Sequence, residues 1–402
     1  MIARFAARPV RLLAMLALAG VAVTGCANFS GQDAQAAPTT WSAEPTLTPE
    51  NAPEPSMPGS GGSSQNNGGN SGGSSTAVPP PQGCTDYNPA VIATCLDTVD
   101  AVAALPSSPT DPVVLAAERS TGRILKVQKG KPATVLATLS VDTTGGGGLT
   151  GLALSPSYTS DQLIFAYITT PTDNRVVRIA PGDTPKPILT GIPRGATDNR
   201  GVLALDHTGA LLVATGDAGN PANSANPASL AGKVLRIDVD GTPAQGDPTP
   251  NSSVLASGLV NPGGLCSSLD GTKTWVTDDA GTADLLYRFQ LNQTQTLSQA
   301  AWSWPDKPGV AGCAAFSSSV LVSTSTAGNV QSLALNSDGS FSGTPQVALA
   351  GNQGFGRLSG MDILSDSSAL AGTVNKAGGT PVSSDDRVVL ISGASALPPG
   401  RD

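Results

Sequence analysis

The chain has 402 residues, of which 39% are hydrophobic and only 13% are charged, and its formal net charge at pH 7 is −8. This acidic balance argues against nucleic acid or anionic lipid as a direct partner, since both are bound through basic patches. After the N-terminal segments described next, about 320 residues have the composition of a globular domain.

The first 25 residues have the pattern of a signal peptide. Three arginines precede the apolar run LLAMLALAGVAV (12–23), which is too short to span a bilayer comfortably. The run is followed by TGC, so Cys26 lies at the junction that a bacterial lipobox places at its cleavage site. We expect cleavage before Cys26 and its acylation, which would anchor the protein to the extracytoplasmic side of the cell membrane. An ordinary signal peptide with a chance cysteine is the alternative.

Residues 26–83 lack the apolar side chains that a core requires. They contain APEPSMPGSGGSSQNNGGNSGGSS and PPPQG, a composition typical of flexible linkers. A linker of this length would span about 40 Å root mean square. We therefore interpret residues 26–83 as the lipidated cysteine with a disordered tether, and residues 84–402 as the folded domain.

Four cysteines remain after Cys26. An even number in an exported protein indicates two disulfides, although four cysteines allow three connectivities. We favour Cys84–Cys95 and Cys266–Cys313, which would stabilise the domain by about 3 and about 4 kcal/mol. A metal site built from the four thiolates is the alternative, although no CxxC spacing occurs.

The folded domain repeats one unit six times, each with two β-rich runs around a loop. The first runs are VVLAAE (113), LIFAYI (163), LLVATG (211), TWVTDD (274), VLVSTS (320) and ALAGTV (369). Their partners are RILKVQ, RVVRIA, KVLRID, LLYRFQ, VQSLAL and RVVLIS.

Further short strands flank most of these pairs, which gives about four strands in every ~50 residues and no helical periodicity. Four-stranded units at this period are typical of a β-propeller, which closes in a ring and leaves few open edges. We predict an all-β fold, a six-bladed β-propeller with four-stranded antiparallel blades. A pair of β-sandwiches is the alternative, but it would not explain the repeats.

The only histidine, His207, lies in RGATDNRGVLALDHTGALLVATGDAGN (194–220). GVLAL and ALLVAT predict a hairpin with DHTG as its turn, so we expect His207 to be an exposed turn residue. Asp198 and Asp217 are nearly equidistant from the turn and should meet at the other end of the hairpin, more than ~15 Å from His207. The two aspartates would then lie on the opposite face of the propeller.

Four long segments carry a resemblance to a known family. They are GGGGLTGLALSPSYTSDQLIFAYITTPTDNRVVRI (145–179), LLVATGDAGNPANSANPASLAGKVLRIDVDG (211–241), SGLVNPGGL (257–265) and TVNKAGGTPVSSDDRVVLI (373–391). They resemble the glucose/sorbosone dehydrogenases, soluble quinoproteins that use pyrroloquinoline quinone (PQQ) with calcium to oxidise sugars. The resemblance implies a six-bladed propeller, in agreement with the repeats. With the lipobox and the tether, WSWPDKPGVAGCAA (302–315) resembles mycobacterial lipoproteins of this family.

The resemblance also implies where an active site would lie. The family's histidine base corresponds to Asp198 here, whereas the aspartate that orients the base is retained. The family's calcium is held by the carbonyls of a Gly-Pro pair that corresponds to Gly281 and Thr282. The candidate residues are therefore Asp198 and Asp217 for catalysis, Asn261 and Arg357 for the cofactor, and Gly281 and Thr282 for the metal.

Several cofactor-binding positions of the family are replaced. Two arginines correspond to Val260 and Ser359, a lysine to about Thr326, and an acidic or amide residue to Gly146. PQQ carries three carboxylates, and cationic side chains must offset their desolvation. Hydride abstraction also needs a base with a pKa near the working pH, which Asp198 would have only if burial or a neighbouring charge raised its pKa. We therefore expect no cofactor, with PQQ and calcium bound only if the family function is retained.

Three further features are candidate sites. The loop DAGNPANSANP (217–227) has oxygen ligands that suit calcium, although Asx turns explain its composition equally simply and are favoured. Asp278 and Asp279 follow WVT and should open on the same face as the aspartate pair, where carboxylates could hold a cation or sugar hydroxyls. Trp302 and Trp304 could stack on a sugar, but packing within a blade is the favoured interpretation.

We weigh three functions. The favoured one is a membrane-anchored, monomeric propeller that binds a sugar, another envelope ligand or a partner at a degenerate quinoprotein site, without redox chemistry. The first alternative is a PQQ- and calcium-dependent aldose dehydrogenase with a rearranged site. The second is a non-catalytic scaffold of the cell envelope, which would use the rim or the flat faces of the propeller.

Overall fold

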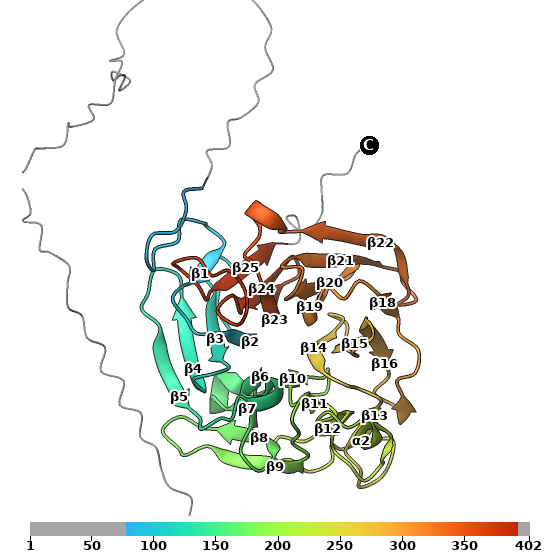
Figure 1. The fold of residues 1–402 in the computed structure, drawn as a ribbon. Helices are drawn as coiled ribbons and strands as arrows, with labels where there is room; N and C mark the ends of the chain where they lie inside the picture. The colour runs from blue at the N-terminus through green and yellow to red at the C-terminus, as the bar shows by residue number, and fades with distance from the viewer. Residues whose placement is uncertain (1–77, 393–402) are drawn as a thin grey trace, which may run out of the picture. The chain divides into compact units, whose positions relative to one another are not determined.

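A computed structural model describes residues 78–392, which form six sheets arranged as blades around one axis (Figure 1). Five sheets have four strands and one has five, so the predicted six-bladed propeller is confirmed. The predicted signal peptide, Cys26 and nearly all of the predicted tether lie outside the described residues. Within residues 78–392 there is no helix with the length and hydrophobicity that a membrane span requires.

The strands of each blade are given from the inner to the outer edge. Blades 1 and 2 contain β2 (Val99–Ala104), β3 (Val113–Glu118), β4 (Arg123–Gln128) and β5 (Thr134–Thr138), then β6 (Leu149–Leu154), β7 (Ile164–Thr169), β8 (Asn174–Ile179) and β9 (Lys186–Ile192). Blade 3 contains β10 (Gly201–Leu205), β11 (Leu211–Thr215), β12 (Lys233–Ile237) and β13 (Val254–Ser257), with β17 (Gln295–Thr296) added in parallel.

The remaining blades follow the same plan. Blades 4 and 5 contain β14 (Pro262–Ser267), β15 (Thr274–Asp279), β16 (Asp284–Phe289) and β18 (Trp302–Trp304), then β19 (Val310–Ala315), β20 (Ser319–Thr324), β21 (Val330–Leu335) and β22 (Phe341–Ala348). Blade 6 contains β23 (Leu358–Ser365), β24 (Ser368–Thr373), β25 (Val388–Ser392) and β1 (Val91–Ala93). The short helices are α1 (Tyr158–Asp161), α2 (Pro221–Ala225), η1 (Thr144–Gly146) and η2 (Gly351–Gln353).

The second strand of each blade reads as a continuous apolar run because both of its faces are buried between blades. In β3, Leu115 and Ala117 pack in the core shared with blade 2. Val114 and Ala116 point the other way, into the core shared with blade 6. Since side chains alternate along a strand, one hydrophobic strand joins two inter-blade cores.

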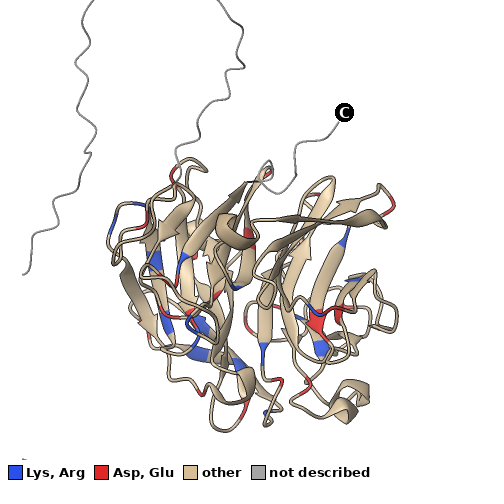
Figure 2. Ribbon diagram, turned by 45° about the horizontal axis from the view of Figure 1, so that its top comes forward, with Lys and Arg blue, Asp and Glu red and all other residues tan. Residues whose placement is uncertain are grey.

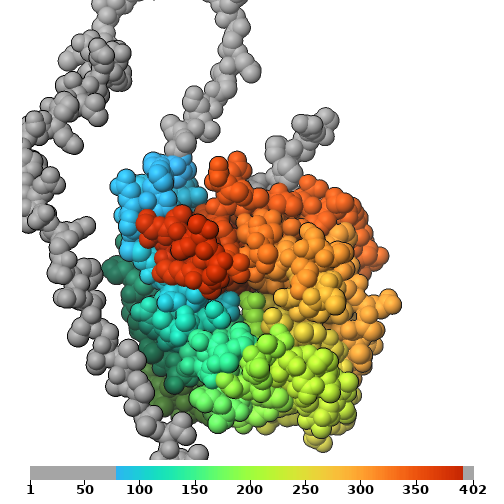
Figure 3. Space-filling view, viewed as in Figure 1, coloured from blue at the N-terminus to red at the C-terminus, as the bar shows by residue number. Residues whose placement is uncertain are grey.

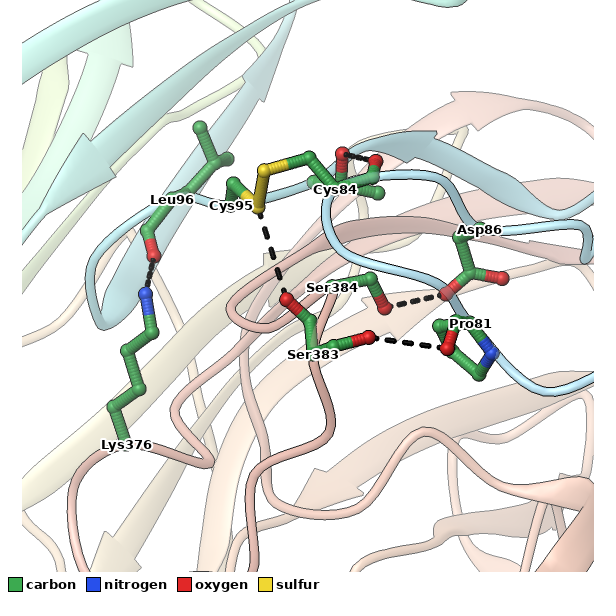
Figure 4. The surroundings of a disulfide bond; sticks show 9 residues. Pro81, Cys84, Asp86, Cys95, Leu96, Lys376, Ser383 and Ser384 are labelled. Carbon is green, nitrogen blue, oxygen red and sulfur yellow. Dashed lines mark hydrogen bonds between the residues drawn. A yellow bond between two sulfur atoms is a disulfide. The ribbon is translucent and has the colours of Figure 1, made fainter. Parts of the chain in front are cut away.

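The chain closes the ring by pairing its first strand with its last blade. β1 pairs with β25 in antiparallel register, with Val91 opposite Val389. The first described residues consequently lie against the last blade, where blue meets red in Figure 3. The Cys84–Cys95 disulfide secures the segment that precedes blade 1, and the Ser384 hydroxyl donates to Asp86 at 2.8 Å beside it (Figure 4).

The second disulfide joins two neighbouring blades. Cys266 in β14 and Cys313 in β19 are bonded, with their Cα atoms 5.7 Å apart. Both of the favoured cysteine pairings are therefore confirmed, and the alternative of a metal site built from the four thiolates is wrong.

The inner strands surround the axis of the propeller, so their two ends open on opposite faces. At their C-terminal ends lies a cavity of about 370 Å³, lined mostly by apolar side chains and by the Cys266–Cys313 disulfide. Asp362 faces this cavity, and burial raises its pKa to about 6. Lysines and arginines are scattered among the blades in Figure 2 and form no continuous basic face in that view.

Candidate active site

The hairpin of blade 3 brings the two predicted aspartates together. β10 pairs with β11 from Gly201–Thr215 to Leu205–Leu211. Beyond the Gly201–Thr215 pair, the Ala218 N–H donates to the Asp198 carbonyl at 3.1 Å, which places Asp198 beside Asp217. His207 is exposed in the turn at the opposite end of the hairpin, as predicted. Its position rules out a role as a base beside the aspartates.

A buried amide fixes the loop that carries Asp198. Asn199 is fully buried, its Nδ2 donates to the carbonyls of Thr144 and Gly195 at 3.1 and 2.8 Å, and its Oδ1 accepts from the Gly195 N–H at 2.8 Å. Asp198 itself has φ 54°, a left-handed conformation that Asp tolerates better than most residues. Asn199 was not predicted as a functional residue, because its place directly after the base position is the only signal that the sequence gives for it.

Asp217 is almost completely buried, at 1% exposure. Its Oδ1 accepts from the Gly219 N–H at 2.8 Å, and its main-chain N–H donates to the Val260 carbonyl at 2.8 Å. Burial raises the pKa of Asp217, and the charge of Asp198 raises it further. Asp198 is half-buried, and its carboxylate accepts from the Thr197 hydroxyl at 2.8 Å.

A third carboxyl lies behind the first two. Asp278 is fully buried, and its Oδ1 accepts from the N–H groups of Val260 at 3.1 Å and Asn261 at 2.7 Å. Burial raises the pKa of Asp278 to about 7, and the charges of Asp279 and Asp217 act in the same direction. The Val260–Asn261 backbone thus joins Asp217 to Asp278. We call Asp198, Asp217, Val260, Asn261 and Asp278 the acidic mouth.

Most cations around the acidic mouth are already engaged. Arg200, directly before β10, lies 3.1 Å from Asp100, and Arg194 lies 2.5 Å from Asp142. Arg357 differs, because its guanidinium has no hydrogen bond or ion pair within residues 78–392 and its Nε is buried without a partner. Sequence analysis identified Arg357 but missed the two ion pairs, whose partners lie more than 50 positions away along the chain.

The loop at 217–227 is closed by its own hydrogen bonds. The Asp217 carboxylate accepts from Gly219, and the Asn220 side chain accepts from the Ala222 N–H at 3.2 Å as the N-cap of α2. These contacts confirm the Asx-turn interpretation of the loop. No group of three or more His, Cys, Asp or Glu side chains in the described part of the chain is arranged to hold a metal.

A buried lysine binds the carbonyls of the same loop. Lys233, at the start of β12, is fully buried, and burial lowers its pKa. Its Nζ donates to the carbonyls of Asn223 at 2.7 Å, Ser224 at 2.8 Å and Ala231 at 3.1 Å. An ammonium therefore supplies the positive charge that the loop oxygens bind.

The positions that correspond to lost cofactor contacts lie in different surroundings. Ser359 is 1% exposed, and its hydroxyl donates to the Val99 carbonyl between blades, so its side chain is not free to face a ligand. Thr326 is exposed on a loop. Gly146 is also exposed, and a Cβ there would meet no atom within 4 Å.

The predicted metal position carries a lysine. Nζ of Lys307 donates to the Gly281 carbonyl at 2.7 Å and lies 3.0 Å from Asp279 Oδ1. The Asp279 carboxylate is therefore paired with Lys307, and the neighbouring Thr282 N–H donates to the Ala280 carbonyl at 3.0 Å. The oxygen that would bind calcium already accepts from an ammonium.

Trp302 and Trp304 belong to the packing of blade 4. They lie on its outer strand, β18, with their rings edge to face and the centroids 6.4 Å apart. Trp304 is 4% exposed, and both rings pack in the core between blades 4 and 5. This is the favoured packing interpretation, and neither ring belongs to the acidic mouth.

These residues do not fit PQQ with calcium. A ligand with three carboxylates needs several free cations, and Arg357 is the one predicted contact that offers one. The negative charges of Asp198 and Asp217 would repel such a ligand. The metal position is taken by Lys307. What the acidic mouth does offer is hydrogen-bond acceptors.

Comparison with known proteins supports the fold and the family resemblance. A model of the glucose/sorbosone dehydrogenase family matches residues 101–286. The structure of the PQQ-bound aldose sugar dehydrogenase from Streptomyces coelicolor is 26% identical, with a TM-score of 0.68 over 79% of this chain and 99% of that one. The apo form of the soluble aldose sugar dehydrogenase from Escherichia coli is 18% identical, with a TM-score of 0.64 over 75% and 98%, and supports the fold alone.

No curated protein matches the chain significantly. The family match covers the first four blades as far as β16, and the structural likeness covers the propeller. Residues 101–286 therefore match the glucose/sorbosone dehydrogenase family model, within a propeller that has the fold of the PQQ-dependent sugar dehydrogenases.

Proposed function

We propose that this propeller binds a neutral, polyhydroxylated ligand such as a sugar at the acidic mouth, without redox chemistry. The observation that carries the proposal is an excess of acceptors. The half-buried Asp198 carboxylate accepts one hydrogen bond, from the Thr197 hydroxyl, and the buried carboxyl of Asp217 lies beside it. A carboxylate has about four acceptor positions, so Asp198 retains capacity for hydroxyl donors. An anionic quinone such as PQQ would offer this carboxylate further hydrogen-bond acceptors rather than donors.

We further propose that the protein is anchored to the membrane through acylated Cys26 and acts as a monomer on the extracytoplasmic side. The lipobox pattern and the Pro-, Gly- and Ser-rich tether support this location. Two disulfides also suit an oxidising compartment. A tethered sugar-binding propeller would reach ligands of the cell envelope.

The direct test uses the full chain and measures two ligand classes. Aldoses and envelope oligosaccharides are titrated by calorimetry, and PQQ with calcium is titrated by its absorbance. We expect heat from at least one carbohydrate, no absorbance shift at micromolar PQQ, and no reduction of an artificial electron acceptor with aldoses. Losing two charge-assisted contacts at about 1.5–3 kcal/mol each would weaken PQQ binding at least ~10²-fold.

Matched variants locate the carbohydrate site. Asp198→Asn removes a charge and part of the acceptor capacity at the acidic mouth, and should weaken carbohydrate binding about tenfold or more, the effect of a lost charged hydrogen bond. Asp183→Asn removes an exposed carboxylate from a turn in blade 2 and should leave binding unchanged. Equal binding by both variants would exclude the acidic mouth.

One observation favours the dehydrogenase alternative: the unpaired guanidinium of Arg357 could bind a carboxylate of PQQ. The PQQ-bound state of the Streptomyces coelicolor relative points the same way. Restoring two family residues together, Asp198→His with Val260→Arg, should introduce PQQ binding; Ser359 is left unchanged because it is buried between blades. Micromolar PQQ binding and sugar oxidation by the unmodified chain would instead establish the dehydrogenase. Failure of every carbohydrate and of PQQ would favour the scaffold.

A further inference from the structure

The loop between β15 and β16 is held by a lysine from a turn further along the chain. Lys307 follows β18, and its Nζ donates to the Gly281 carbonyl at 2.7 Å. The same Nζ lies 3.0 Å from Asp279 Oδ1. A backbone carbonyl and a carboxylate are the oxygen ligands that calcium takes in proteins. The ammonium therefore binds a ligand pair suited to a hard cation.

The backbone at Lys307 has an uncommon conformation. Its φ is 49°, a left-handed value that costs a residue with a Cβ free energy relative to glycine. The following residue is Pro308, and a residue before proline prefers an extended conformation. The contacts around Lys307 therefore hold its backbone in this conformation.

A second contact attaches the same turn to the same loop. Asp284, at the start of β16, is fully buried, and its Oδ2 accepts from the N–H groups of Gly309 and Val310, at 2.5 and 2.9 Å. The other oxygen of Asp284 is buried without a hydrogen-bond partner. The hydrogen bond with Asp279 and the charges of Asp279 and Asp284 raise the pKa of Lys307.

We propose that the Lys307 ammonium replaces the calcium ion that the family resemblance places at Gly281, so that this loop is held without a metal. The inference does not depend on which ligand the acidic mouth binds. It explains why a chain with the propeller of calcium-using enzymes carries a fixed positive charge at this position. A bound metal would have to displace an ammonium that already holds both oxygens.

The test is the calcium response of thermal unfolding, measured on the full chain with chelator and with calcium. The unmodified protein should have the same Tm in both conditions. Lys307→Ala exposes the Gly281 and Asp279 oxygens, and calcium should then raise the Tm by about 2 °C at roughly ten times its Kd. Lys307→Arg retains the charge and should remain insensitive to calcium.

Lys186→Ala is the matched control, because it removes an exposed lysine that pairs with Asp183. It should show no gain in calcium response. The proposal is overturned if calcium raises the Tm of the unmodified protein, or if folded Lys307→Ala gains no response. Calcium titration of the unmodified protein by calorimetry does not depend on any variant folding, and binding at micromolar concentration would also overturn the proposal.

Discussion

The buried carboxyl of Asp278 should make the stability of this propeller fall as the pH rises. Burial raises the pKa of Asp278 from an ordinary value of 3.8 to about 7. Between these values the folded chain holds a proton that the unfolded chain has released. The folded state binds more protons in this window, so the free energy of unfolding decreases with increasing pH.

The size of the effect follows from the width of this window. Each pH unit corresponds to about 1.4 kcal/mol per proton, and the window is about three units wide. Asp278 should therefore lower the free energy of unfolding by up to ~4 kcal/mol between about pH 4 and pH 8. Asp278→Asn removes this dependence, while its Oδ1 can still accept from Val260 and Asn261.

Guanidinium unfolding at about pH 5 and about pH 8, followed by tryptophan fluorescence, measures the difference. The free energy of unfolding should fall more steeply in the unmodified chain than in Asp278→Asn, by about 2–4 kcal/mol over this interval. Asp183→Asn controls for the loss of an exposed carboxylate and should follow the unmodified chain. Parallel profiles for the unmodified chain and Asp278→Asn would refute the assignment of a buried, protonated carboxyl.

Three further outcomes follow from the positions of single residues. His207→Ala should change the free energy of unfolding by no more than ~0.5 kcal/mol, as at an ordinary surface site; a loss above ~2 kcal/mol in denaturant would contradict its exposed position. Lys233→Met leaves three buried carbonyls without their donor and should cost about 2–4 kcal/mol, whereas exposed Lys186→Met should cost little in the same assay. Cys26→Ala should move the protein from the membrane to the soluble fraction without changing the Tm; retention in the membrane after a high-salt wash would exclude lipid anchoring.

The six blades could be predicted because each one is indicated by a short, local stretch of sequence. Each second strand is an apolar run, and both its faces are buried, so the six runs mark the six blades. The two runs around the DHTG turn similarly predicted that His207 lies at one end of the hairpin and that Asp198 and Asp217 lie at the other end. Ring closure was not predictable, since β1 has only three residues and pairs with a strand nearly 300 positions away.

The candidate site was predictable in its residues but less so in its contacts. The aspartates, Asn261 and Arg357 could be named from the resemblance. That Asp278 is buried and joined to Asp217 through Val260 depends on how blades 3 and 4 pack. The contact of Lys307 with Gly281 depends on a left-handed backbone at a lysine. Residue type alone predicts neither arrangement.

The role of Val260 explains why the site could change without loss of the fold. Its N–H donates to Asp278 and its carbonyl accepts from Asp217, so the structural contacts of this position come from the main chain. Any side chain that fits at position 260 preserves these main-chain hydrogen bonds. Replacement of an arginine by valine therefore removes a cation without breaking the contacts of the acidic mouth. The carboxyls of Asp217 and Asp278 are then stabilised by main-chain N–H groups and, for Asp278, by protonation. The acidic mouth is therefore stable without the cationic side chains that an anionic cofactor would need. This arrangement suits neutral hydroxyl groups better than an anionic cofactor.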